Sequence, residues 1–147
     1  MADRPGVIAP PPLIFAAAFA AGCLGRGWLP RIGSRPAGVV LAAAAFAFAT
    51  LAALVMFRAK THIDPYRPAT ALVTSGPFRI TRNPLYVSLT LLYCGVALFF
   101  AMPAALGTLP LALVALHFGV IRREERYLET KFGDEYRAYM ARVGRWL

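Results

Sequence analysis

The sequence predicts an all-α integral membrane protein with about four transmembrane helices and an amphipathic helical tail in the cytoplasm. Of its 147 residues, 59% are hydrophobic and only 16% are charged, compared with about 25% in a typical soluble domain. The charged residues lie between long apolar runs rather than within them. The longest run, residues 83–121, contains no Asp, Glu, Lys or Arg and is too long for one helix across a bilayer core of about 30 Å. We therefore expect this run to fold back and return both flanking polar clusters to one membrane face.

The first half of the chain predicts two spans within a single membrane domain, residues 1–147. Residues 11–29 form an apolar run rich in alanine and glycine, and the prolines at its start suit a first helical turn. Residues 37–57 are uncharged and long enough to cross a bilayer. Residues 58–83 carry proline and glycine turn signals and predict an ordered cytoplasmic loop.

The second half predicts a helical hairpin. Asn83 is expected to cap a third span over residues 84–102, with Pro84 at its first position. The fourth span is expected over residues 104–121. Three helix breakers are expected to make the tight reversal between these spans: Pro103, Gly107 and Pro110.

The tail, residues 122–147, carries apolar residues at helical spacing and predicts two amphipathic helices. Gly133 is expected to end the first helix and Asp134 to cap the second. Most of the 16 Lys and Arg residues lie in the N-terminus, the 58–83 loop and the tail. The positive-inside rule places these parts, and both termini, in the cytoplasm. With no organelle signal evident, we expect a bacterial inner (plasma) membrane protein.

The net charge of +9 fits anionic membrane lipid as a partner better than nucleic acid. The basic residues flank membrane segments and form no separate basic domain, so no nucleic-acid partner is expected. The two cysteines are isolated in apolar runs and predict no metal site. The sequence sets no oligomeric state.

Glu125 is the most informative single residue. It interrupts an apolar stripe on the first tail helix, where a half-buried carboxylate needs a counter-charge or a bound cation. Glu124 lies about 100° around the helix and is expected to share this task. The alternative for both carboxylates is an ion pair with a neighbouring arginine such as Arg122 or Arg82.

Other candidates are expected at the same membrane face. His117 shares a face with Glu125 if the fourth span continues into the tail as one helix, and the alternative is a neutral histidine that only hydrogen-bonds a helix neighbour. The helix start at Arg82 and Asn83 favours an anion, and the alternative is an ordinary cap with flanking arginines. Three tyrosines are candidates to surround a cationic group, or else ordinary interface residues: Tyr86, Tyr136 and Tyr139. Together these residues predict a ligand with a carboxylate and a separate cation.

Three segments carry a family resemblance. Residues 76–86 read GPFRITRNPLY, Gly95 follows in the next helix, and residues 124–139 read EERYLETKFGDEYRAY. They resemble the Gly-Pro-aromatic-Arg and Arg-His-Pro-x-Tyr signature, a helix glycine and the terminal Glu-Glu motif of the isoprenylcysteine carboxyl methyltransferase and phospholipid N-methyltransferase group. Asn83 stands where isoprenylcysteine enzymes have histidine, so no general base is expected there.

The resemblance implies an integral-membrane enzyme that uses S-adenosyl-L-methionine at the cytoplasmic face. It implies a lipophilic or membrane-delivered small acceptor, whether a carboxylate, a thiol or an amine. Arg145, with Arg142 second, best matches a family arginine linked to the substrate. An amine or hydroxyl acceptor would need a base, and His117 and Glu125 are the candidates. The cofactor-binding residues carried over by position, with one neighbouring tyrosine, are Arg82, Asn83, Tyr86, Glu124, Glu125 and Tyr136.

Two other classes of protein stay open. A small four-helix transporter subunit would use an acidic residue deep within a span, and the four apolar runs contain none. A non-catalytic membrane scaffold or lipid-binding protein would rest its basic tail on anionic lipid. The position of Glu125 on the buried face argues against a tail of that kind.

Overall fold

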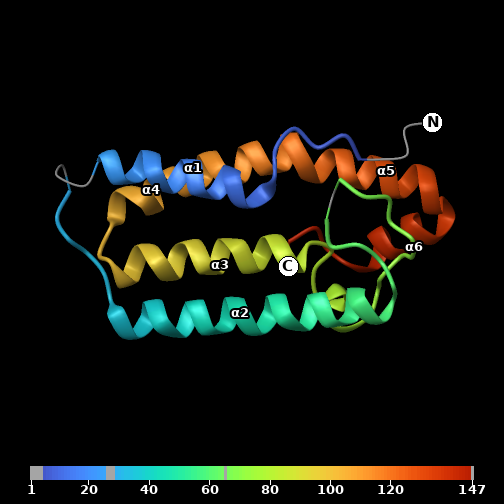
Figure 1. Ribbon diagram of the computed structural model, residues 1–147, viewed down its shortest axis with the longest axis horizontal. Coiled ribbons are helices and arrows are strands. Elements are labelled where there is room, and N and C mark those ends of the chain that lie inside the picture. The colour runs from blue at the N-terminus through green and yellow to red at the C-terminus, as the bar shows by residue number, and fades with distance from the viewer. Residues whose placement is uncertain (1–4, 26–28, 65, 147) are drawn as a thin grey trace.

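The computed structural model describes residues 5–25, 29–64 and 66–146, and within them it is all-helical, with no strand. This confirms the predicted all-α class. Figure 1 shows the long helices side by side, with the short tail helices at one end. The elements are, in order, α1 (Pro11–Leu24), α2 (Arg35–Arg58), the 3₁₀ turn η1 (Gly76–Arg79), α3 (Pro84–Phe99), α4 (Pro103–Leu116), the π-helical turn η2 (His117–Ile121), α5 (Arg122–Phe132) and α6 (Asp134–Arg142).

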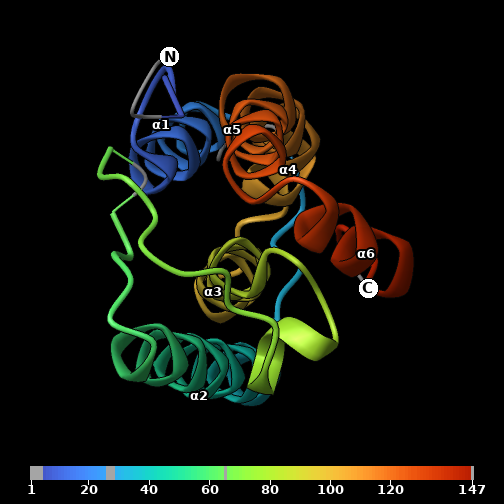
Figure 2. The same cartoon turned by 90° about the vertical axis from the view of Figure 1, so that its right-hand side faces the viewer.

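The long helices pack as two pairs, α2 along α3 and α1 along α4, with fewer contacts between the pairs. Figure 2 shows α3 lying between α2 and the other pair. Glycines let α2 and α3 approach closely. A Cβ on Gly38 would lie 2.6 Å from the carbonyl oxygen of Gly95, and a Cβ on Gly95 would lie 2.9 Å from that of Gly38. Small residues allow such close backbone contact between membrane helices.

Hydrogen bonds join the second pair to α3. The Tyr93 hydroxyl donates to the carbonyl of Ala105 at 2.8 Å, and Thr108 Oγ1 donates to the carbonyl of Ala18 at 2.9 Å. Tyr93 Oη and Thr108 Oγ1 also lie 2.9 Å apart. These partners satisfy polar side chains in an apolar interior, where an unpaired hydroxyl is costly.

Two helices are long and apolar enough to cross a membrane: α2, and the continuous helix from Pro103 to Phe132. At about 1.5 Å per residue, the 24 residues of α2 extend roughly 36 Å. α1 has 14 residues and α3 has 16, so both are shorter than a full span. The surface of α2 turned away from the bundle is apolar, as suits contact with lipid, and its exposed residues include Val39, Val40, Phe46, Leu51, Leu54 and Phe57.

Several helix boundaries differ from those expected. The first helix ends at Leu24 rather than near residue 29, and residues 26–28 lie outside the described part of the chain. The reversal after α3 takes only residues 100–102, with Ala101 at φ 52°, and α4 begins at once with Pro103. Gly107 and Pro110 lie inside α4 and do not break it, because neighbouring groups in a membrane bundle can satisfy the backbone that a proline frees.

The fourth span and the tail are one helix rather than separate elements. α4 runs through the π-helical turn η2 directly into α5, although its apolar stretch ends at Ile121. Gly133, at φ 55°, ends α5 as predicted. Asp134 is wrong as a cap, because Gly133 itself occupies the N-cap position and Asp134 is the first residue of α6.

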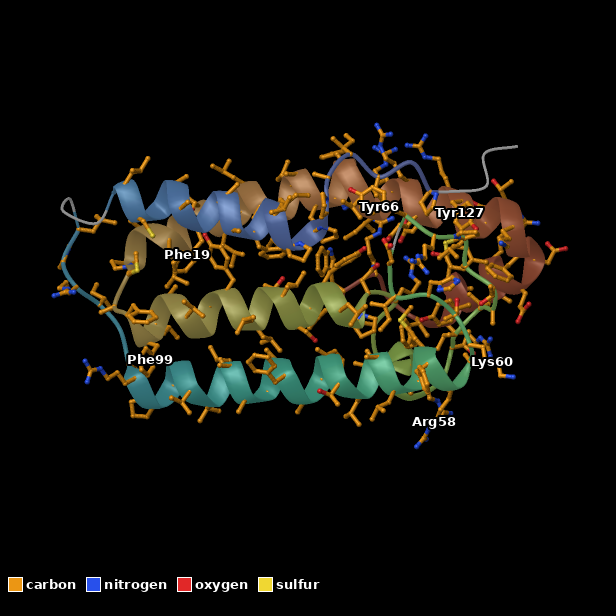
Figure 3. All side chains as sticks on the ribbon, in the orientation of Figure 1. Phe19, Arg58, Lys60, Tyr66, Phe99 and Tyr127 are labelled. Carbon is orange, nitrogen blue, oxygen red and sulfur yellow. The ribbon has the colours of Figure 1, made fainter. Side chains whose placement is uncertain are left out.

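The predicted folding-back is confirmed. Figure 1 shows the segment between α2 and α3 at the same end of the bundle as α5 and α6. Figure 3 labels Arg58, Lys60 and Tyr127 at this end and Phe99 at the opposite one. The two polar clusters therefore meet although about 40 apolar residues separate them along the chain.

Candidate functional site

A cavity of about 150 Å³ lies where the two polar clusters meet. Residues 61–64 and 66–73 cover it, the start of α3 forms one wall, and α5 and α6 form another. Its polar lining includes all six residues expected to bind the cofactor: Arg82, Asn83, Tyr86, Glu124, Glu125 and Tyr136.

The end of the chain fixes the wall that carries Arg82. The backbone N–H of Arg82 donates to the carbonyl of Gly144 at 3.0 Å. The carbonyl of Arg145 accepts hydrogen bonds from Thr81 Oγ1 at 3.0 Å and Asn83 Nδ2 at 2.9 Å. We refer to residues 143–146 as the C-terminal strap. Asn83 occupies the N-cap position of α3 as predicted, but its side chain makes no cap hydrogen bond, and its amide nitrogen bonds the strap instead.

The GPFR turn, η1, is held from both sides. Gly76 has φ 58°, which favours glycine, and a Cβ there would lie 2.9 Å from Val55 of α2. The Tyr139 hydroxyl of α6 donates to the carbonyl of Phe78 at 2.7 Å. This bond and the strap bring the two sequence motifs together.

Glu125 is paired with two arginines. Arg145 donates to both of its oxygens, through Nε to Oε1 at 2.9 Å and through Nη2 to Oε2 at 2.6 Å. Arg82 Nη1 lies 3.1 Å from Oε1. The ion-pair alternative is therefore realised for Glu125, with Arg82 as one partner and Arg145, rather than Arg122, as the other.

Arg82 is the unsatisfied group of the site. Its side chain is only 11% exposed, and its Nε and Nη1 are buried without a hydrogen-bond partner. The 3.1 Å contact with Glu125 is an attraction between charges that lacks the alignment of a hydrogen bond. Buried polar atoms without partners are uncommon and costly, so these two donors favour an acceptor that enters the cavity.

Glu124 lies in α5, beyond the apolar stretch, and faces the cavity beside Tyr86. The Tyr86 hydroxyl lies 2.8 and 2.9 Å from its two oxygens and donates to the carboxylate. Burial raises the pKa of Glu124 to about 7; the Tyr86 hydrogen bond opposes this rise and the charge of Glu125 adds to it. Glu124, unlike Glu125, has no arginine partner among the described residues.

The α6 tyrosines close the same wall. Burial, aided by the nearby Glu125 carboxylate, raises the pKa of Tyr136 to about 12, and the Arg82 charge opposes the rise. Burial also raises the pKa of Tyr139. Both hydroxyls therefore stay protonated near neutral pH and present neutral rings and donors.

The profile of the phospholipid methyltransferase family matches residues 34–135. The chain belongs to this family. A curated protein of Haemophilus influenzae, described as an uncharacterized protein, is 70% identical over 27 residues, which cover 18% of this chain and 43% of that protein. The chain thus spans less than half of that relative's length. No solved structure matches the chain.

Membership of the phospholipid methyltransferase family confirms the resemblance drawn from the sequence and implies, in general terms, a methyltransferase activity at a membrane. The apolar helices agree with a membrane protein. The matched region contains Arg82, Glu124 and Glu125.

None of the three residues expected to take part in catalysis lines the cavity. His117 stands within η2, and its ring packs edge-on against the ring of Phe118, with centroids 4.8 Å apart. The fourth span does continue into the tail as one helix, but His117 precedes Glu125 by two turns, about 12 Å along the axis at 1.5 Å per residue. Arg142 is exposed and donates to the carbonyl of Ala138, whereas Arg145 reaches the site through Glu125.

The sequence analysis missed how the cavity is covered. The backbone N–H of Ala69 donates to the Tyr127 hydroxyl at 3.1 Å, which fastens the covering segment to α5. Thr70 bonds Thr61 Oγ1 and the carbonyl of Lys60, which closes the segment on itself. The spacing of Tyr127, three residues after Glu124, was the available signal that it lies on the cavity side.

Proposed function

We propose that this chain is an S-adenosyl-L-methionine-dependent methyltransferase that acts on a lipophilic or membrane-delivered small acceptor at the cytoplasmic face. The observation that carries the proposal is Arg82, a buried guanidinium whose Nε and Nη1 make no hydrogen bond, in a cavity also lined by Glu124, a carboxylate with no arginine partner among the described residues. A ligand that combines a carboxylate with a cationic group would satisfy both.

The residues present fit this cofactor. The unspent donors of Arg82, together with the positive end of the α3 dipole, suit the carboxylate of its methionine part. Glu124 suits the ammonium group or the ribose hydroxyls. The rings of Tyr86 and Tyr136 suit a neighbouring positive charge. Asn83 acts instead through the strap, since its amide nitrogen is already bonded to the carbonyl of Arg145.

When bound, this cofactor supplies a methyl group on a positively charged sulfur, which an electron-rich acceptor takes by in-line displacement. The chain contributes orientation and exclusion of water, which matter most when the acceptor is already a thiolate or carboxylate. Glu124, which lines the cavity and has a raised pKa, suits the task of accepting a proton from an amine or hydroxyl acceptor.

The cavity is smaller than the roughly 300–1,000 Å³ of most ligand pockets. We infer that residues 61–64 and 66–73 move outward when the nucleoside enters. Among these described residues few hydrogen bonds reach the rest of the chain, and the Ala69–Tyr127 bond fastens them to α5. Lid movements of this kind commonly accompany ligand binding in enzymes.

We infer that the chain lies in a bacterial inner membrane, with α2 and the α4–α5 helix crossing it and α1 and α3 inserted beside them. Because most positive charges gather at the end that holds the cavity, this end and both termini would face the cytoplasm. Membrane lipid would then reach the cavity from the side as acceptor or as solvent for the acceptor.

A calorimetric titration of S-adenosylhomocysteine into the detergent-purified protein tests the proposal. We expect saturable binding of about one ligand per chain in the micromolar range. Arg82→Gln should weaken it about tenfold or more, since a hydrogen bond to a charged group contributes roughly 1.5–3 kcal/mol. Arg79→Gln is the matched control, because Arg79 is exposed and absent from the cavity lining.

If folded wild-type protein binds neither S-adenosylhomocysteine nor S-adenosylmethionine, the proposal is overturned, and the non-catalytic scaffold becomes the better interpretation. If Arg82→Gln and Arg79→Gln lose S-adenosylhomocysteine affinity equally, the role assigned to Arg82 is overturned, but the methyltransferase proposal is not.

A further inference from the structure

We propose that Arg145 is a positioning residue: by holding Glu125, it keeps the donors of Arg82 free for the carboxylate of the ligand. This inference rests on the proposed function. It gives Arg145 a role different from the substrate contact that the family resemblance implies.

Two arginines face one carboxylate, and they do not share it equally. Arg145 occupies both Glu125 oxygens, at 2.9 and 2.6 Å, in the forked arrangement that a planar guanidinium makes with a carboxylate. Arg82 approaches only Oε1, at 3.1 Å, and its Nη1 makes no aligned hydrogen bond. Glu125 thus makes its aligned hydrogen bonds with Arg145 and only a charge contact with Arg82.

This division leaves Arg82 stabilised but unsatisfied. The nearby negative charge of Glu125 offsets the burial of its guanidinium. Its Nε and Nη1 nevertheless keep their hydrogen atoms available. An entering carboxylate would therefore not have to break an existing hydrogen bond of Nε or Nη1 before it binds Arg82, and this lowers the cost of binding.

The backbone fixes Arg145 for this task. Its carbonyl accepts from Thr81 and Asn83, the residues on either side of Arg82. The backbone N–H of Arg82 itself donates to Gly144. The two arginines are therefore held on adjacent backbone segments that are hydrogen-bonded to each other. Glu125 of α5 lies between their side chains.

Removing Arg145 should let Glu125 turn onto Arg82 and compete with the ligand. In Arg145→Met, we expect S-adenosylhomocysteine to bind at least about tenfold more weakly, the loss typical of one charged hydrogen bond. 5′-Methylthioadenosine has the same thioether nucleoside and no amino acid part. Its affinity should change by less than about twofold, because it presents no carboxylate to Arg82.

The double variant Glu125→Gln/Arg145→Met separates positioning from mere structure. If Arg145 acts through Glu125, removing the carboxylate as well should restore most of the lost S-adenosylhomocysteine affinity. Arg126→Met is the matched control, since Arg126 is exposed on α5 and its side chain donates to the carbonyl of Arg122. It removes the same charge without touching Glu125.

Calorimetry with both probes decides between the outcomes. Selective loss of S-adenosylhomocysteine binding in Arg145→Met, with recovery in the double variant, supports the inference. Equal loss of both probes, no loss, or no recovery overturns it. If Arg145→Met does not fold, Arg145→Lys serves instead: lysine neutralises Glu125 but cannot occupy both oxygens, so the same selective loss is expected and its absence overturns the inference.

The wild-type protein separates this inference from the proposed function. Wild type that binds S-adenosylhomocysteine while the variants fail the test refutes the role of Arg145 and leaves the methyltransferase proposal standing. Wild type that binds neither probe overturns both.

Discussion

Replacing Glu124 by glutamine should change how the stability of the protein depends on pH. The pKa of this carboxyl rises from 4.5 to about 7 in the folded protein, mainly because the side chain is buried. Below pH 4.5 the carboxyl is protonated in both folded and unfolded chains and contributes no difference. Above pH 7 it is ionised in both, and the folded protein carries the full cost of a buried charge.

The sign follows from proton binding. Between pH 4.5 and 7 the folded protein binds more protons at Glu124 than the unfolded chain does, so stability falls as pH rises through this interval. At about 1.4 kcal/mol for each unit of pKa, the full fall reaches roughly 3 kcal/mol. Glutamine does not titrate, so the free energy of unfolding of Glu124→Gln relative to wild type should rise by up to that amount across the interval.

Denaturant unfolding in mixed micelles, followed by tryptophan fluorescence at several pH values between 4 and 8, measures this difference. Comparing the variant with wild type at each pH cancels any pH-independent effect of the substitution on packing. Glu135→Gln corrects for net charge, because it removes an exposed carboxyl from α6. A constant difference between Glu124→Gln and wild type across this range would refute the electrostatic account of the site.

Two further predictions concern packing and the cover of the cavity. Gly38→Ala should destabilise the protein by about 1–3 kcal/mol, because the new Cβ would lie 2.6 Å from the carbonyl oxygen of Gly95 in α3. Gly107→Ala is the control, because Gly107 has open space around it and the substitution should be neutral or slightly stabilising. Equal shifts of the thermal unfolding midpoint in the two variants would contradict the close-contact argument. Tyr127→Phe removes the hydroxyl that accepts from the Ala69 N–H. Amide hydrogen exchange should therefore quicken in residues 61–64 and 66–73, while the amides of α2 and α3 stay protected. Unchanged exchange at Ala69 would show that this bond does not fasten the cover.

The sequence was sufficient for the fold class because charge patterning is a strong signal in a membrane chain. A run of about 40 uncharged residues cannot remain one span, and the predicted return of Arg82 and Glu125 to one end follows from bilayer thickness alone. The helix that starts at Pro84 and the stop at Gly133 were also predicted, because proline and glycine act locally through backbone geometry.

Predictions that depended on side-chain partners were less successful. Asn83 occupies the N-cap position of α3, but its side chain bonds the distant strap rather than the helix start, and a partner so far along the chain leaves no mark in the local sequence. His117 was expected beside Glu125, but it lies two helical turns away and outside the cavity lining. Glu125 was correctly expected to need a counter-charge, yet nothing in the spacing indicated that Arg145 would take both of its oxygens.

The arrangement of the helices in pairs means that the site is split between two halves of the molecule. Arg82 belongs to the half built from α2 and α3, whereas Glu124 and Glu125 extend from the helix that packs with α1. Neither half holds both Arg82 and the two carboxylates. A small change in the angle between the halves would therefore alter the separation of these charges. With the chain in a bilayer as proposed, we expect the thickness of that bilayer to influence this angle and, through it, ligand affinity.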